Sequence, residues 1–160
     1  MAIQKGERLP QGTFMHMTSE GPKPITTDEI FKGKKVVLFS VPGAFTPTCS
    51  NQHLPGFVEQ VEQFKAKGVD AVACMAVNDP FVMDAWARSK GAQGKLLMLS
   101  DGNGQFTKQI GLELDGSKFF LGTRSKRFSM VLEDGVVKEL NVEAPGEFKV
   151  SSAEATVCQL

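Results

Sequence analysis

Cys49 is the residue of this sequence whose type and position most clearly predict chemistry. It follows an apolar run at residues 36–41 and a turn that begins at Pro42-Gly43, and it falls in the first turn of an expected helix. At that position the free backbone N–H groups and the positive end of the helix dipole favour the thiolate over the thiol. Because the thiolate is the nucleophilic form, the sequence predicts a reactive thiol here.

His53 lies four residues after Cys49, a spacing at which two helical side chains can meet. A histidine there could activate the thiolate, as in a cysteine hydrolase. A hydrolase also needs a third, orienting group and an oxyanion site, and His16 is the only other histidine. We therefore favour a structural or dimer-surface role for His53 over that of a base.

The composition excludes several classes of partner. Lys+Arg and Asp+Glu are both 18, so no overall charge would attract nucleic acid or an anionic membrane. No stretch reaches the roughly 18–20 apolar residues of a membrane span, and the N-terminus lacks the apolar segment of a signal peptide. We expect a cytoplasmic protein in which residues 1–160 form a single domain.

The three cysteines, Cys49, Cys74 and Cys158, form no Cys-x-x-Cys motif. An odd number with these spacings argues against a disulfide framework and against a zinc site, so no metal is expected. Cys74 lies in an apolar run, which favours an inert core cysteine over a resolving thiol. Cys158 is close to the C-terminus and is expected to be exposed.

The elements that must position Cys49 alternate between strands and helices. Buried strands are predicted at residues 36–41, 71–77 and 96–99, with helices after Cys49 and after Asn78-Asp79-Pro80. This order predicts an α/β fold with parallel strands and helices on both faces. Asp134-Gly135, between two apolar runs, predicts a β-hairpin that adds an antiparallel edge and makes the sheet mixed.

Shorter signals predict the remaining elements. They are a strand or hairpin near residues 12–15, a helix with the capping box Thr26-x-x-Glu29, a kink or join at Pro55, a short helix at residues 105–110, and a terminal helix within 150–160 that begins at Ser151 or Ser152.

The spacing Pro42-x-x-x-Thr46-x-x-Cys49 resembles the active-site signature of the peroxiredoxins. The wider blocks at residues 41–50 and 53–57 look like the type II, or Prx5-like, subfamily of bacteria and plants. Further resemblances at residues 77–82, 125–131 and 140–143 extend the match over nearly the whole chain. The resemblance implies a thioredoxin-like fold and cysteine-based reduction of hydrogen peroxide and organic hydroperoxides, without a cofactor.

By this resemblance Cys49 is the peroxidatic nucleophile, and Thr46 hydrogen-bonds the thiolate and the peroxide. Pro42 shields the sulfur, and Arg127 is the active-site arginine, a fixed cation that favours the thiolate. Arg127 alternates with the apolar residues that follow it, which places it on the opposite face of its strand. A solvated strand arginine is the plainer alternative, and Arg124 is close enough to be confused with it.

The resemblance also places Pro47, Thr48 and Phe120 at the substrate, and it favours a homodimer packed near the active site. Five aromatic residues could line the substrate funnel or the dimer seam: Phe45, Phe81, Trp86, Phe119 and Phe120. We expect most of them to be core residues, with Phe45 and Phe120 nearest the seam.

Attack on a peroxide converts Cys49 to a sulfenic acid that a second thiol must reduce. The resemblance admits a one-cysteine cycle, reduced by glutathione with or without glutaredoxin or by thioredoxin, and an atypical two-cysteine cycle in which Cys74 resolves.

Two other classes of protein compete with a peroxidase. A thioredoxin-like disulfide oxidoreductase or glutathione transferase is disfavoured because Cys49-Ser50-Asn51-Gln52 has no second cysteine, and a redox sensor stays open.

Overall fold

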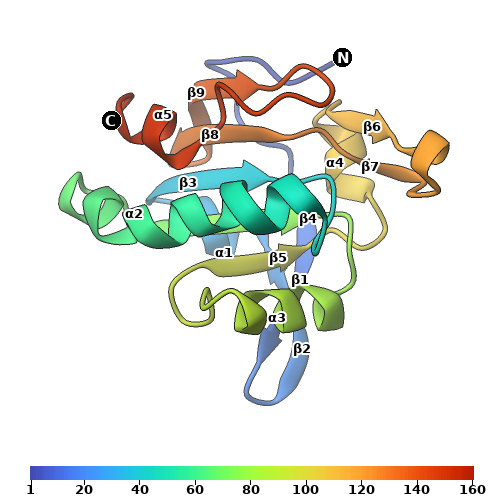
Figure 1. Cartoon of the computed structure of the whole chain (residues 1–160). Helices are drawn as coiled ribbons and strands as arrows, with labels where there is room; N and C mark the ends of the chain where they lie inside the picture. The colour runs from blue at the N-terminus through green and yellow to red at the C-terminus, as the bar shows by residue number, and fades with distance from the viewer.

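A seven-stranded mixed sheet runs through the middle of the molecule (Figure 1). The computed structural model describes residues 1–160 and gives the strand order β2-β1-β5-β4-β3-β8-β9. Strands β3, β4 and β5 are parallel, and the outer pairs β1–β2 and β8–β9 are antiparallel. The predicted α/β architecture with a mixed sheet is therefore confirmed.

The strands of this sheet are β1 (Thr13–Thr18), β2 (Gly21–Thr26), β3 (Lys35–Ser40), β4 (Ala71–Ala76), β5 (Leu97–Ser100), β8 (Phe128–Glu133) and β9 (Val136–Val142). The helices are α1 (Thr27–Phe31), the π-helix η1 (Cys49–His53), α2 (Leu54–Ala66), α3 (Pro80–Ser89), α4 (Gln105–Gln109) and α5 (Ala153–Val157). A separate ribbon of β6 (Glu113–Asp115) and β7 (Thr123–Ser125) encloses the 3₁₀ helix η2 (Ser117–Phe119).

Each face of the sheet carries its own apolar core. Strand β3 serves both, because Val37 and Phe39 point to one face while Val36 and Leu38 point to the other. Helices α2, α3 and α5 pack on the first face, and α1 and α4 on the second. Burial on both faces explains why residues 36–41 are continuously apolar.

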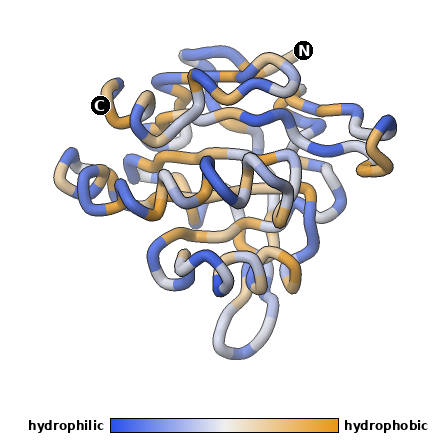
Figure 2. The backbone as a smooth tube through the Cα atoms, viewed as in Figure 1, coloured by the Kyte–Doolittle hydropathy of each residue, from blue (hydrophilic) through white to orange (hydrophobic).

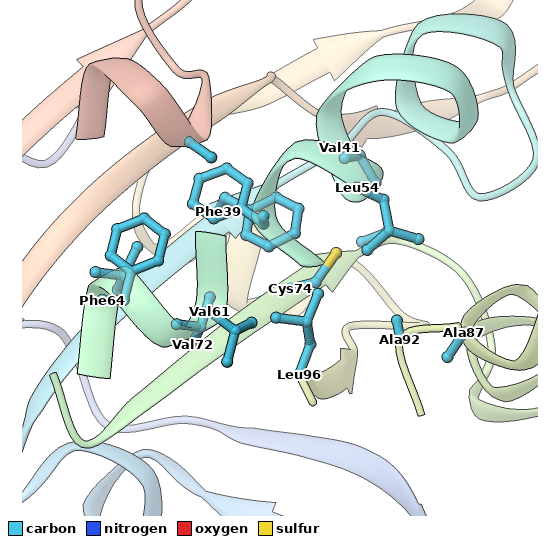
Figure 3. Packing of buried hydrophobic residues seen from close by; sticks show 14 of the residues in the cluster. Phe39, Val41, Leu54, Val61, Phe64, Val72, Cys74, Ala87, Ala92 and Leu96 are labelled. Carbon is cyan, nitrogen blue, oxygen red and sulfur yellow. The ribbon is translucent and has the colours of Figure 1, made fainter. Parts of the chain in front are cut away.

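Figure 3 shows the first of these cores from close by, with the sulfur of Cys74 among apolar side chains. Figure 2 shows the corresponding pattern along the chain: hydrophobic colour follows the central strands, whereas the tip of the β1–β2 hairpin is pale to blue. No helix combines the length and the apolar character that crossing a membrane would require.

Local signals in the sequence begin and end these elements as predicted. Thr26 and Glu29 form the capping box of α1, and Asp79 caps α3 by accepting a hydrogen bond from the Val82 N–H at 2.8 Å. The β8–β9 hairpin turns through Asp134 and Gly135, at φ values of 51° and 75°. Ser152 caps α5, which settles the choice between the two serines.

Candidate active site

The chain between β3 and Cys49 is held as a tight turn over the end of the sheet. Phe45 adopts a left-handed backbone conformation with φ 65°, and the N–H of Ala44 donates to Oδ1 of Asn78 at 3.0 Å. The Ser50 N–H then donates to the Thr46 carbonyl at 2.9 Å and starts the helix. Cys49 is thereby fixed in the first helical turn, where it is 0% exposed.

The helix that carries Cys49 contains one π-helical turn near its start. The Leu54 N–H donates to the Cys49 carbonyl, five residues back, before the regular helix α2 follows. Pro55 has no N–H and stands directly after this change of geometry. The predicted join at Pro55 is confirmed, and η1 is the first of the two pieces.

Arg127 reaches Cys49 from the start of the neighbouring strand β8. Its Nη2 lies 3.1 Å from Cys49 Sγ, although the two residues are 78 positions apart in the chain. The register that pairs Ser40 with Phe128 brings the end of β3 beside the start of β8 and so causes the meeting. Phe128 points into the second core, so Arg127 points to the opposite face, as its alternation predicted.

Arg124, the competing arginine, has a different role in the structure. Its Nη1 donates to the Pro42 carbonyl at 3.2 Å, and its Nε donates to the Leu121 carbonyl at 2.9 Å. It therefore braces the turn before Cys49 and does not contact the sulfur.

The Thr46 hydroxyl differs from the expectation carried by the resemblance. It donates to the Gly43 carbonyl at 2.7 Å instead of to the Cys49 sulfur. The left-handed Phe45 folds the chain back so that this carbonyl lies within reach of Thr46. The single hydroxyl hydrogen is thus engaged, while the oxygen keeps lone pairs that can accept.

His53 is buried beside Arg127, and the alternative that placed it on a dimer surface is wrong. Its Nδ1 lies 2.9 Å from Arg127 Nη1 and its Nε2 lies 2.9 Å from the Ser151 carbonyl oxygen. Phe39, Phe57 and Phe148 surround the imidazole, with ring centroids 5.0–5.5 Å away. The predicted structural role is confirmed. The contact with Arg127 was not foreseeable from the sequence, because it spans 74 residues.

Burial lowers the pKa of His53 to about 3, and the neighbouring Arg127 charge acts in the same direction. These effects outweigh the Ser151 carbonyl and the Glu143 carboxylate, which favour the protonated ring. His53 is therefore neutral at physiological pH and holds the arginine as a hydrogen-bond acceptor.

A small cavity of about 110 Å³ opens beside Arg127, which forms part of its wall. Its lining is Pro42, Thr48, Leu114, Lys126, Arg127 and residues 143–147. Two of the three predicted substrate contacts lie outside the lining: Pro47 is exposed at the helix start, and Phe120 is 98% exposed beyond η2. Within one chain, Thr48 alone among the three faces the cavity.

The aromatic residues correct a further expectation, since Trp86 alone of the five is a core residue. Phe45, Phe81, Phe119 and Phe120 are all exposed. The physical reason is their placement. Phe119 and Phe120 lie at the end of η2, between β6 and β7. Phe45 forms the left-handed turn before Cys49, and Phe81 lies on the outer side of α3. The sequence shows their apolar character but not these positions.

All three cysteines are free in the structure. Cys74 is buried in β4, as predicted for a core cysteine, and Cys158 is exposed. Burial, followed by the nearby Cys49, raises the pKa of the Cys74 thiol well above its ordinary value despite the opposing effect of Arg127. No three His, Cys, Asp or Glu side chains come together in a group that could hold a metal ion.

A mixed sheet covered on both faces, with a cysteine held against a guanidinium at the start of a helix, is the arrangement of a thioredoxin-like thiol enzyme. Comparison with known proteins agrees: the Redoxin family model matches residues 4–157. The chloroplastic peroxiredoxin-2E of Arabidopsis thaliana is 46% identical over 157 residues, which cover 96% of this chain and 67% of that protein. Peroxiredoxin-2C of Oryza sativa subsp. japonica is 49% identical over 153 residues, covering 95% of this chain and 94% of the relative.

Among solved structures, reduced Prx3 of Vibrio vulnificus in complex with hydrogen peroxide superposes with a TM-score of 0.95 at 50% identity, and the match covers 98% of each chain. The chain therefore belongs to the Redoxin family and, within it, to the peroxiredoxins of the type II, Prx5-like subfamily. Its fold is the thioredoxin-like peroxiredoxin fold, and its activity is that of a thiol-dependent peroxidase, an antioxidant oxidoreductase that acts on hydroperoxides and is reduced by a thiol.

Proposed function

We propose that Cys49 is the peroxidatic nucleophile and that Arg127, Thr46 and Pro42 complete its site. The observation that carries this assignment is the 3.1 Å contact between Cys49 Sγ and Nη2 of Arg127, a residue that also lines the cavity. The thiolate sulfur bonds to one peroxide oxygen, and the O–O bond breaks. Its electron pair goes to the leaving oxygen, which takes a proton and departs as water or an alcohol. Cys49 is left as a sulfenic acid.

Arg127 serves this step in two ways. A guanidinium remains charged and stabilises the thiolate, and its further N–H groups can stabilise negative charge on the leaving oxygen. Its second contact, with His53, holds the side chain in one orientation, so that less reorganisation is needed in the transition state.

Thr46 acts on the peroxide as an acceptor. Because its hydroxyl hydrogen is directed at the Gly43 carbonyl, its oxygen is left to accept the O–H of a bound hydroperoxide. That contact orients the peroxide with one oxygen toward the sulfur. Pro42 and Thr48 form part of the cavity wall and limit the access of water, and the exposed Pro47 precedes Thr48 in the chain.

Glutathione, with or without glutaredoxin, or thioredoxin is the reductant that we propose for the Cys49 sulfenic acid, in a one-cysteine cycle. The burial and raised pKa of Cys74 support this cycle, since thiolate formation there is disfavoured. Glutathione-linked turnover that persists in both Cys74→Ser and Cys158→Ser is the expected result. Loss of turnover in either variant would assign that cysteine as the resolving thiol.

A homodimer in the cytoplasm is the assembly and compartment that we propose for this single domain of residues 1–160. Phe120, at the end of η2, and Phe45, in the turn before Cys49, are exposed apolar side chains that a second copy would cover. In the dimer, Phe120 would then complete the substrate funnel that it does not reach within one chain. Three free thiols fit a reducing compartment. Sedimentation of wild type against Phe120→Ser, which should dissociate, tests the seam.

Stopped-flow mixing of the reduced protein with hydrogen peroxide tests the nucleophile. Consumption of one peroxide per Cys49, far faster than by a free thiol, is expected for wild type, and no fast phase for Cys49→Ser. Mass spectrometry of the treated protein should place the first added oxygen on Cys49. Fast consumption by Cys49→Ser would overturn the assignment.

A further inference from the structure

A single carboxylate oxygen of Glu143 accepts hydrogen bonds from all three residues of the chain segment 149–151. Its Oε2 accepts from the N–H groups of Lys149, Val150 and Ser151 at 2.7, 2.9 and 2.9 Å, and from the Ser151 hydroxyl at 2.7 Å. The residue is 6% exposed, and no lysine or arginine forms a salt bridge with it. The carboxylate is therefore held by hydrogen-bond donors alone.

These donors keep the carboxylate charged inside the protein. Burial would raise the pKa of Glu143, but the Ser151 hydroxyl and the three N–H groups outweigh burial and lower it. A single oxygen that accepts from all four donors holds the backbone of residues 149–151 in one conformation.

The segment that Glu143 fixes is the one that holds His53. The Ser151 carbonyl accepts from His53 Nε2 at 2.9 Å, and the Phe148 ring centroid lies 5.0 Å from that of the imidazole. His53 in turn accepts from Arg127 at 2.9 Å, and Arg127 donates to Cys49 at 3.1 Å. One continuous series of contacts therefore joins the carboxylate to the sulfur.

The charge on Glu143 does not compete for the guanidinium. Glu143 and Arg127 both line the cavity, and the Glu143 N–H donates to the Arg127 carbonyl at 3.0 Å, yet the two side chains form no salt bridge. A carboxylate paired directly with Arg127 would offset the positive charge that favours the thiolate. Because segment 149–151 occupies Oε2, the guanidinium is left to Cys49 and His53.

We propose that Glu143 is a positioning residue for peroxide reduction, which acts through segment 149–151 and His53 to hold Arg127 against Cys49. The inference rests on the proposed role of Arg127 in the peroxidase site and extends it to a residue whose carboxylate is bonded to segment 149–151. Because the Glu143 side chain forms no hydrogen bond with Cys49 or with the Arg127 side chain, its effect is separable from theirs by experiment.

Three variants and two readouts test the proposal. Glu143→Ala removes the acceptor, Glu143→Gln keeps one amide oxygen in its place, and Ser152→Ala removes the cap of α5 without touching Oε2. The readouts are the second-order rate with hydrogen peroxide and the pH dependence of Cys49 alkylation by iodoacetamide, which follows the thiolate. Unfolding midpoints of all three proteins measure the change in stability.

We expect Glu143→Ala to slow the peroxide reaction on the order of 100-fold, as for a catalytic group displaced by about 1 Å, and to move the alkylation curve to higher pH. Glu143→Gln should recover most of the rate, within about tenfold of wild type. Ser152→Ala should lower the unfolding midpoint yet leave the rate and the alkylation curve unchanged.

A wild-type rate and alkylation curve in Glu143→Ala would overturn the inference, as would losses in Ser152→Ala equal to those in Glu143→Ala. If Glu143→Ala does not fold, Ser151→Ala, which deletes only the hydroxyl contact, takes its place. This variant should slow the peroxide reaction less and should also move the alkylation curve to higher pH. An unchanged alkylation curve would again overturn the inference. Arg127→Lys distinguishes a failure of the Glu143 proposal from a failure of the proposed role of Arg127. If Arg127→Lys reacts slowly with peroxide while Glu143→Ala reacts at the wild-type rate, only the Glu143 proposal is wrong. If Arg127→Lys itself reacts at the wild-type rate, the proposed role of the arginine is wrong.

Discussion

Arg127 Nη1 lies 2.9 Å from His53 Nδ1, and this contact requires a neutral histidine. A guanidinium can only donate, so Nδ1 must accept and the ring hydrogen must be on Nε2, which faces the Ser151 carbonyl oxygen. Protonation of Nδ1 would place two donors against each other in a buried site. The neutral imidazole is thus a condition for the observed position of Arg127.

This condition predicts a pH dependence of stability. The pKa of His53 falls from 6.5 to about 3 on folding, so the unfolded chain binds more protons between these values. Stability is then full above about pH 6.5 and is lost as the pH falls toward 3, by up to about 1.4 kcal/mol per pH unit. At pH 5 the loss from this group should be about 2 kcal/mol relative to pH 8.

Denaturant unfolding of wild type and His53→Gln at both pH values measures that loss. Glutamine can accept and donate as the neutral ring does but does not titrate. The lowered pKa of Glu143 has the same sign, but its ordinary value is 4.5, so most of its contribution is lost only below that pH. Equal losses in the two proteins between pH 8 and pH 5 would contradict a neutral, buried His53.

Exchange of each arginine for lysine should separate the two candidates for the active-site cation. Arg127→Lys keeps the charge but loses the fork that contacts Cys49 and His53 together, and removal of one such donor typically slows a reaction by about 10²–10³-fold. Arg124→Lys loses only carbonyl contacts to the turn, so a decrease of less than about tenfold is expected. Stopped-flow rates with hydrogen peroxide measure both, and the reverse order would assign the role to Arg124.

Gly43 lies where even a methyl group would be crowded. A Cβ atom there would stand 3.0 Å from Arg124 Nη1 and 3.1 Å from Thr46 Cγ2, so Gly43→Ala should displace Thr46 and reduce kcat/KM for peroxide by about 10–100-fold. The matched control is Gly56→Ala in α2, where the new Cβ would meet only the Ala153 Cβ at 3.8 Å. That variant should stabilise the helix by about 0.5–1 kcal/mol and retain activity. Equal activity in the two variants would show that the turn tolerates the methyl group.

Trp86 donates from Nε1 to Ser50 Oγ at 2.9 Å within the core, directly beside Cys49 in sequence. Ser50→Ala leaves the indole N–H without its partner, which should reduce the free energy of unfolding by about 1–3 kcal/mol. Trp86 is the single tryptophan, so its fluorescence should also shift in this variant. Circular dichroism in urea measures the stability, and a cost below about 0.5 kcal/mol would show that the N–H finds water instead.

The sequence predicted those parts of the fold that depend on local signals. Residues 36–41 had the composition of a doubly covered strand, Asp134-Gly135 had the residues that a tight turn requires, and Thr26 with Glu29 had the spacing of a cap. Each signal acts within a few residues, so one chain suffices to read it. The join at Pro55 was predictable for the same reason, although the π-helical geometry of η1 was not.

The site was predictable only where the resemblance supplied what local signals could not. The alternation after Arg127 predicts the face on which it lies, but only the register of β3 against β8 shows that Arg127 reaches the sulfur and Arg124 reaches Pro42. The hydrogen bonds of His53 reach residues that are 74 and 98 positions away in the chain. Those of Glu143 reach residues only 6 to 8 positions away, but they depend on the path that the chain takes after β9. The exposure of Phe120 likewise follows from its place beyond η2 and not from its apolar character.

The pairing of Ser40 with Phe128 has a consequence for synthesis and folding. The thiol and the arginine are 78 residues apart in the chain, so no partly translated chain that ends before Arg127 can hold both halves of the site. Contacts of such long sequence separation form late and slowly in a folding reaction. Peroxide-reducing activity should therefore appear only with the last, rate-limiting step of folding, which makes the recovery of activity a kinetic measure of native topology in this protein.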